Sequence, residues 1–290
     1  MCGIVGVLLL DRDLEPQLGE LLTAMLVQMT ERGPDSAGVA IYADGVPDGS
    51  SKYSCRADGD AEVDWAALAA EIGATATSSG RAAVLSGPAG HRGDLEARGL
   101  TVVSSGQDLE VFKGVGLPVD ISNEYGLPGR HGYLGVGHTR LATESAVTTD
   151  GSHPFSTHDD LCVVHNGSFS NYFTVRRDLE GEGERFLTAN DTEVAARLLG
   201  REMDQGRDLR DALRVLQKEM DGFYTLVCAT RDQMAVVRDE FGCKPAMVAV
   251  TDRYVAVASE FRALAVLPDI ATADVFEPTP TEIYLWERPR

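Results

Sequence analysis

The sequence has little positive charge and no long hydrophobic run. Its 290 residues include 26 Lys and Arg against 45 Asp and Glu, a formal net charge of −19 at pH 7. Nucleic-acid binding needs cationic contacts to phosphate, and docking on anionic lipid needs a basic surface, so we expect neither partner. The apolar run Gly3 to Leu10 is too short to span a bilayer and follows no basic stretch. The composition therefore predicts a cytoplasmic protein with no membrane span, whose partners are small molecules or other proteins.

Paired cysteines, metal-ligand spacings and cofactor motifs are also missing. An odd number of widely spaced cysteines favours a reducing compartment over a disulfide framework. The histidines and carboxylates lack metal-ligand spacing, so we expect no metal. The glycines at 132–137 lack the following helix that a dinucleotide fold needs, so we expect no cofactor. The cysteines are Cys2, Cys55, Cys162, Cys228 and Cys243.

The remaining 43% of hydrophobic residues is ordinary for a globular protein. The run at 3–10 predicts a strand buried on both faces. Leucine and methionine recur at helical spacing over 14–29, and Gly33 and Pro34 follow. Because further strands and helices also come in groups, we expect an α+β fold of antiparallel sheets covered by helices. Residues from about 45 to 120 show only patchy periodicity, and we interpret them as an inserted loop-and-helix elaboration.

Cys2 lies directly behind the initiator methionine. Cysteine is often a small buried hydrophobe, so this position has a purely structural interpretation. The alternative is that removal of Met1 exposes an α-amine with a pKa of roughly 8 beside the thiol. Such an amine could take the proton of the thiol and later deliver it to a leaving amine.

Other candidate residues come at the ends of predicted strands or helices. The Asn166 amide and the Gly167 N–H could stabilise an oxyanion, although an Asn-Gly turn is the favoured interpretation of that stretch alone. Arg140 could hold a carboxylate with a bidentate fork, assisted by Thr143. Asp191 could bind an ammonium or simply cap a helix. Taken singly, each of these signals is weak.

Together, the motifs resemble the class II glutamine amidotransferases, whose glutaminase domain is of the N-terminal-nucleophile hydrolase type. The likeness covers the whole chain except the stretch near 45–120. The motifs occur in this order: "CGIVGV" at 2–7, "RGPDSAG" at 32–38, "GHTRLAT" at 137–143, "HNG" at 165–167, "NDTE" at 190–193, "RDEFGCKP" at 238–245 and "SEFRAL" at 259–264.

The resemblance implies one glutamine amidotransferase type 2 domain over 1–290, with a four-layer αββα fold and the insertion at about 45–120. It implies that L-glutamine is the substrate and that Cys2 is the nucleophile, with its own α-amine as base. The implied roles of the other residues follow the motifs. Asn166 and Gly167 form the oxyanion hole, Arg140 and Thr143 bind the α-carboxylate, Asp191 binds the α-ammonium, and Arg32 belongs to a loop over the site.

The sequence departs from some family members at Leu141 and Glu144, where those members carry an aromatic residue and a histidine. No synthase domain is attached, so the chain is most similar to stand-alone amidotransferase subunits of glutamate-synthase-like complexes, the N-methylglutamate synthase type. Such a subunit would pass ammonia to a partner synthase subunit. Two alternatives stay open: an N-terminal-nucleophile hydrolase of another amide, and a non-catalytic regulatory or scaffold subunit. The insertion is the candidate partner surface, with a solvated elaboration as its alternative.

Overall fold

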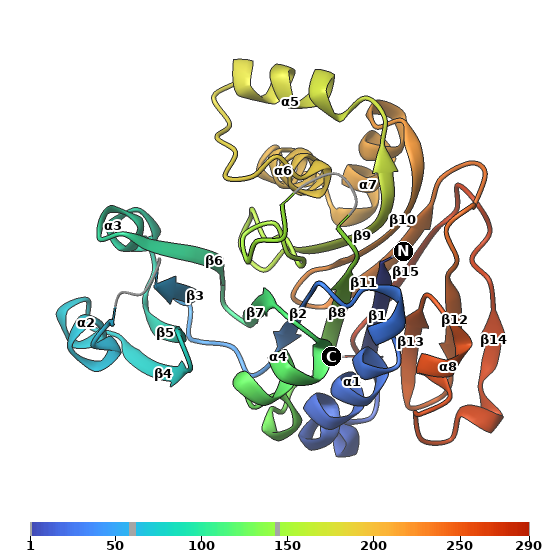
Figure 1. Cartoon of the computed structure of the whole chain (residues 1–290), viewed down its shortest axis with the longest axis horizontal. Coiled ribbons are helices and arrows are strands. Elements are labelled where there is room, and N and C mark those ends of the chain that lie inside the picture. The colour runs from blue at the N-terminus through green and yellow to red at the C-terminus, as the bar shows by residue number, and fades with distance from the viewer. Residues whose placement is uncertain (1, 58–61, 143–145, 290) are drawn as a thin grey trace.

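The computed structural model describes residues 2–57, 62–142 and 146–289. Two stacked antiparallel sheets form its body (Figure 1). The larger sheet has the order β14 (Asp274–Phe276), β12 (Met247–Val250), β13 (Tyr254–Ala258), β1 (Gly3–Leu9), β8 (Leu134–Arg140), β2 (Ser36–Tyr42) and β7 (Leu109–Val115). The smaller sheet has the order β15 (Ile283–Glu287), β11 (Gln233–Arg238), β10 (Gly222–Ala229) and β9 (Cys162–Phe169).

The two faces of β1 explain its continuous apolar sequence. Ile4 and Leu8 point into the core between the two sheets, where they meet side chains from β9, β10 and β11. Val5 and Val7 point the other way and pack under the helices of the outer layer. A strand between two apolar layers has no solvent face, so alternation disappears. The expectation of a strand buried on both faces is confirmed.

Helices cover both outer faces, which completes the expected four-layer αββα sandwich. The larger sheet is covered by α1 (Leu18–Val27), α4 (Pro118–Glu124) and α8 (Phe261–Leu264). The smaller sheet is covered by α5 (Tyr172–Gly181), α6 (Asp191–Asp204) and α7 (Leu209–Glu219), which lie at the top of Figure 1. No helix in the described part of the chain is long and apolar enough to cross a membrane.

The first helical region is more broken than its periodicity predicts. Residues Arg12–Gln17 form a 3₁₀ turn with Pro16 inside it, and the α-helix begins only at Leu18. Proline lacks the amide hydrogen that an α-helical interior requires, so the early residues take the tighter turn. A second 3₁₀ turn, Thr30–Arg32, follows the helix.

The interpretation of residues 45–120 as a loop-and-helix elaboration is wrong. This stretch forms its own antiparallel sheet in the order β4 (Thr75–Ser79), β5 (Ala82–Pro88), β3 (Ser50–Ala57) and β6 (Leu100–Gly106). With α2 (Trp65–Glu71) and α3 (Arg92–Ala97) it encloses a separate small core that includes Tyr53, Leu85 and Leu95. We call residues 50–106 the insertion sheet; it projects to the left in Figure 1. The next strand, β7, already belongs to the body.

The strands of the insertion sheet escaped detection because they carry few large apolar residues. β4 reads TATSS, and most of its side chains are exposed or half-exposed. Short strands of small polar residues at a sheet edge carry little periodic signal.

Candidate active site

Strand register brings Cys2 and Arg140 together although 138 residues separate them. β1 and β8 run antiparallel with Gly3 opposite Thr139, so the residue before Gly3 lies beside the end of β8. There the Cys2 Sγ is 3.9 Å from the carbonyl oxygen of Leu141. The Arg140 side chain is buried, and its Nη1 donates to the carbonyl of Ala146 at 3.3 Å. The nucleophile candidate and the guanidinium therefore lie at the same end of two neighbouring interior strands of the larger sheet.

Two side chains from other segments converge on the backbone of Cys2. Arg32 Nε donates to the Cys2 carbonyl oxygen at 2.8 Å. Asn166 Nδ2, from the smaller sheet, donates to the same oxygen at 3.1 Å. Arg32 Nη1 also makes a 2.7 Å ion pair with Glu260, a residue of the "SEFRAL" motif. These contacts restrain Cys2 from the smaller sheet and from the 3₁₀ turn that follows α1, and Arg32 holds the Cys2 backbone.

The environment of Cys2 disfavours a free thiolate. Burial raises the pKa of the Cys2 thiol above its ordinary value, and the nearby Arg140 and Arg32 guanidinium groups oppose this only in part. Because the thiolate is the nucleophile, such a thiol needs a base beside it to react at neutral pH.

Gly167 occupies a backbone conformation that favours glycine. Its φ is +146°. A Cβ at this position would collide with the carbonyl oxygen of Phe223 on the neighbouring strand β10. The absence of a side chain lets β9 lie close against β10 directly after Asn166, and it leaves the Gly167 backbone exposed.

Asp191 begins α6, but it does not cap it. The capping side chain is Asn190, which accepts from the Thr192 N–H at 2.9 Å. Asp191 Oδ2 instead accepts from the Phe169 N–H at 3.0 Å, and its Oδ1 lies 3.6 Å from His165 Nδ1. Burial alone would raise the pKa of Asp191, but His165 and these backbone amides outweigh it and hold that pKa below its usual value. The carboxylate is therefore ionised at neutral pH and suited to a cation.

Sequence reasoning missed a stack of three buried histidines behind these residues. The rings of His138 and His153 are parallel at 4.0 Å, and those of His153 and His165 lie 6.5 Å apart. His138 Nε2 pairs with the His165 carbonyl oxygen at 2.9 Å, and the His165 N–H donates to His153 Nδ1 at 3.3 Å. The position of His138 and His165 inside the "GHTR" and "HNG" motifs is the signal that could have pointed to them.

Burial keeps His138 and His153 of this stack neutral. It lowers the pKa of His138 to about 3 and that of His153 well below its ordinary value. Thr192 Oγ1 lies 3.0 Å from His165 Nδ1 and 3.3 Å from His153 Nε2. The stack therefore connects the strand that carries Asn166 to the start of α6. No group of three His, Cys, Asp or Glu in the described ranges is arranged to hold a metal ion.

The structure thus gathers six of the seven residues that the sequence marked. The seventh, Thr143, lies outside the described residues. The six are Cys2, Arg32, Arg140, Asn166, Gly167 and Asp191.

The αββα sandwich with a cysteine at the start of a central strand defines the N-terminal-nucleophile amidotransferase class. A solved structure with the same arrangement is the glutamine phosphoribosylpyrophosphate amidotransferase from B. subtilis complexed with ADP and GMP, with a TM-score of 0.66 and 20% identity. The match covers 99% of this chain and 47% of that one, so the chain spans about half the length of that solved protein. At this identity the likeness establishes the fold.

The sequence comparisons establish the family. The family model for the glutamine amidotransferase domain matches residues 129–284. The chain is 47% identical over 298 aligned residues to a glutamine amidotransferase-like protein GlxB of Rhizobium meliloti (strain 1021), covering 99% of this chain and 98% of that one. It is 30% identical to a putative glutamine amidotransferase of Methanothermobacter thermautotrophicus, covering 99% and 100%. The chain belongs to the glutamine amidotransferase family and is a class II member.

Proposed function

We propose that this chain hydrolyses the side-chain amide of L-glutamine through a thioester on Cys2 and passes the ammonia to a partner synthase subunit. Removal of Met1 leaves the α-amine of Cys2 free to take the thiol proton. The thiolate sulfur bonds to the amide carbon, and the carbon–nitrogen bond breaks as the α-ammonium protonates the departing ammonia. Water then hydrolyses the thioester to glutamate. The convergence of Arg32 and Asn166 on the Cys2 backbone carries this proposal.

The surrounding groups match the charges of glutamine and of its transition state. The Asn166 amide and the Gly167 N–H are neutral donors beside Cys2, suited to an oxyanion that forms only during reaction. Arg140 is a buried cation for the α-carboxylate, and Asp191 is an ionised anion for the α-ammonium. We assign Thr143 a further hydroxyl contact to the carboxylate, and Arg32 the positioning of Cys2.

The position of the N-terminus provides the sharpest test of this mechanism. We expect the protein with a C-terminal tag, Met1 removed, to release glutamate and ammonia from glutamine, and the same chain with an uncleavable N-terminal tag to be inactive. Intact mass identifies each form, and circular dichroism confirms the fold. Equal activity of the two forms would refute the amine-as-base mechanism.

Two alternatives predict different results in the same assay. A hydrolase of another amide would leave glutamine intact but cleave a different member of a panel of γ-glutamyl and acyl amides. A scaffold subunit would cleave none of them, even with Met1 removed.

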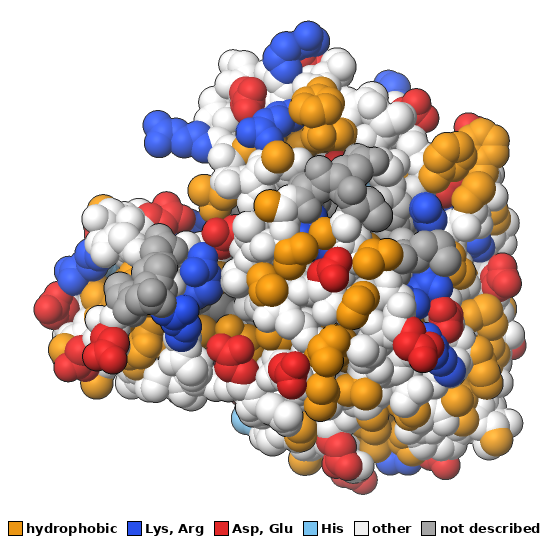
Figure 2. Space-filling model, viewed as in Figure 1, with side chains coloured by type: hydrophobic (Ala, Val, Ile, Leu, Met, Phe, Trp, Pro, Cys, Tyr) orange, Lys and Arg blue, Asp and Glu red, His pale blue; other side chains and the backbone are white. Residues whose placement is uncertain are grey.

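Exposed apolar side chains around Cys2 support the ammonia transfer to a partner. Figure 2 shows exposed hydrophobic side chains spread over one face of the molecule. We use the name apolar rim for five exposed apolar residues whose chain neighbours or contacts belong to the site. Three of these residues directly follow Arg140, Ala146 and Glu260 in the chain, and the other two are Phe223, which lies beside Gly167, and Phe241, which packs against Phe223. Large exposed apolar patches mark protein interfaces. The rim consists of Leu141, Val147, Phe223, Phe241 and Phe261, all at least 36% exposed.

The occupant we assign to the apolar rim is the ammonia-consuming subunit of a glutamate-synthase-like complex. Ammonia that leaves Cys2 into open water is protonated and loses its nucleophilicity. We therefore expect the acceptor site of the partner to lie next to the apolar rim. The net charge of −19 favours a partner whose facing surface is basic. We therefore assign the partner to the apolar rim in preference to the insertion sheet, which the sequence alone marks as the candidate partner surface.

Co-purification from the source cells tests this assignment. We expect the native protein to retain a partner that carries out glutamine-dependent amination in its presence. The Phe241→Ser variant should lose the partner but keep its glutaminase activity. Retention of the partner by this variant and by the Phe223→Ser variant would place the interface elsewhere.

A further inference from the structure

A single loop contacts Arg140 and the residues beside Asp191 and Asn166 in the proposed glutamine site. We call residues 146–154 the site loop. Its Ala146 carbonyl accepts from Arg140 Nη1 at 3.3 Å, and Gly151 lies near the same guanidinium, since a Cβ there would be in ordinary van der Waals contact with Nη1. The Gly151 carbonyl accepts from Asn190, the cap of α6, at 3.2 Å. The loop therefore borders both the Arg140 guanidinium and the helix end that presents Asp191.

The far end of the site loop borders the oxyanion strand. His153 stacks on His138 and accepts from the N–H of His165, the residue before Asn166. The His153 carbonyl oxygen also lies so close to Gly38 on β2 that a Cβ at Gly38 would collide with it. A displacement of the loop would consequently move Arg140, the start of α6 and the strand that carries Asn166.

One buried lysine holds the site loop in place. Lys113 on β7 is 8% exposed, and its Nζ donates to the carbonyls of Asp150, Ser152 and Pro154 at 3.1, 2.8 and 3.2 Å. An ammonium has three N–H donors, and these three carbonyls match them. Burial lowers the pKa of Lys113 to about 8 against the opposing charges of Asp150 and Glu193, so the group is mostly charged at neutral pH.

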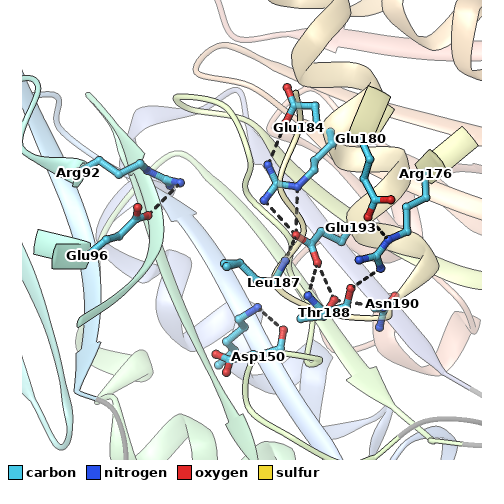
Figure 3. A network of polar contacts seen from close by, with 12 residues as sticks. Arg92, Glu96, Asp150, Arg176, Glu180, Glu184, Leu187, Thr188, Asn190 and Glu193 are labelled. Carbon is cyan, nitrogen blue, oxygen red and sulfur yellow. Dashed lines mark hydrogen bonds and ion pairs between the residues drawn. The ribbon is translucent and has the colours of Figure 1, made fainter. Parts of the chain in front are cut away.

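The same loop is tied to the insertion sheet. Arg56 on β3 makes a 2.7 Å ion pair with the Asp150 carboxylate, whose backbone carbonyl accepts from Lys113. A cleft between α3 and the start of α6 lies beside this contact and is lined by both Lys113 and Asp150. In Figure 3, Arg92 and Glu96 face this cleft from the insertion side, and Asp150 and Glu193 lie across from them. The insertion sheet thus has a direct contact with the loop that borders the site.

We propose that Lys113 is a positioning residue of the glutamine site: by gathering three carbonyls of the site loop it fixes Arg140 and Asp191 relative to one another, and the Arg56–Asp150 ion pair couples the insertion sheet to glutamine binding. This inference rests on the proposed function for its kinetic consequence. It gives the insertion sheet a role in substrate recognition, separate from any docking role.

Steady-state glutaminase kinetics of the Lys113→Met variant test the proposal. Methionine keeps most of the buried stem and removes all three donors. Because the site loop contacts Arg140 and the start of α6 directly, but reaches Asn166 only through His153 and His165, we expect the KM for glutamine to rise about tenfold and kcat to fall less, by no more than about threefold. A well-folded variant with the KM of the native protein would overturn the proposal, and so would a loss confined to kcat.

The Arg56→Leu variant tests the coupling and stands in if Lys113→Met does not fold. The Arg56 side chain is partly exposed, so we expect this variant to fold normally and its KM for glutamine to rise about threefold. In the double variant of Arg56 and Lys113 the two effects on KM should not add, because both residues contact Asp150. The matched control is Arg98→Leu, which removes the Arg98–Glu71 ion pair inside the insertion sheet. Lys218→Met controls for loss of a lysine at an exposed position. A KM change equal to that of Arg98→Leu would overturn the coupling.

Hydrogen exchange separates failure of this inference from failure of the proposed function. We expect Lys113→Met to speed amide exchange in peptides that cover 146–154 and 165–169, without change in α7. Unchanged exchange would overturn the restraint by Lys113. If the native protein did not hydrolyse glutamine but the exchange increased as expected, the proposed function would fail while the restraint of the loop stood.

Discussion

The body and the insertion sheet differ in how their strands are buried and in which residues of the proposed site they carry. In the body, β1 lies between two apolar layers, and Cys2 directly before it lies beside Arg140 and accepts hydrogen bonds from Asn166 and Arg32. The insertion sheet has a small core of its own, and none of the residues proposed for catalysis lies in it. Its ties to the body include two ion pairs, Arg56–Asp150 and Lys52–Glu110. The comparison teaches that the body carries the proposed chemistry and the Lys113 contacts to the site loop, while the insertion sheet adds one further contact to that loop, the Arg56–Asp150 ion pair.

The largest effect should come from the body, at Cys2. We expect Cys2→Ala to lower glutaminase activity at least about 1,000-fold, because removal of a covalent nucleophile abolishes the thioester route. Ammonia release is the measurement, and an unchanged thermal unfolding curve is the control for folding. If the alanine variant released ammonia at the native rate, the thioester mechanism would be wrong.

The next effect concerns the oxyanion site. Loss of one oxyanion donor lowers kcat by about 100- to 1,000-fold in well-studied hydrolases, so we expect Asn166→Ala to fall in that range with little change in KM. Because Asn166 also donates to the Cys2 carbonyl, Asn166→Asp, which keeps the shape but loses the donor, is the companion variant. An effect on KM alone would assign Asn166 to ground-state binding.

Arg140→Lys should affect binding more than turnover. An ammonium cannot reproduce a bidentate fork, and a lost charge-assisted hydrogen bond of about 1.5–3 kcal/mol corresponds to a KM raised roughly 10- to 100-fold. Initial rates across glutamine concentrations measure this. An unchanged KM would remove Arg140 from the carboxylate site.

The smallest effect on chemistry should come from the core of the insertion sheet. Leu95 is fully buried there, and Leu→Ala changes in cores cost about 2–5 kcal/mol. We expect Leu95→Ala to loosen the insertion sheet, seen as faster hydrogen exchange over 50–106, while kcat stays within about twofold of the native value. A loss of kcat comparable to that of Asn166→Ala would end the separation between the two regions.

The contrast between the regions also explains which sequence predictions succeeded. The strand at 3–10 was predicted correctly, because a strand that lies between two apolar layers is apolar at nearly every position. The αββα class was predicted correctly from the ordered motifs and the family that they resemble. The insertion was misread because strands such as β4 expose most of their side chains. The histidine stack was missed because a buried neutral histidine has the same letter as an exposed charged one.

The sequence by itself determined the class and the identities of the candidate residues, because ordered motifs specify residue types and their order along the chain. Only the tertiary structure decided which of them meet. The pairing of Gly3 with Thr139 brings Cys2 to Arg140, and the stacking of the sheets brings Asn166 to Cys2. The three hydrogen bonds from Lys113 to the site loop have no sequence signature. Every residue has a backbone carbonyl, and only folding gathers three of them around one ammonium.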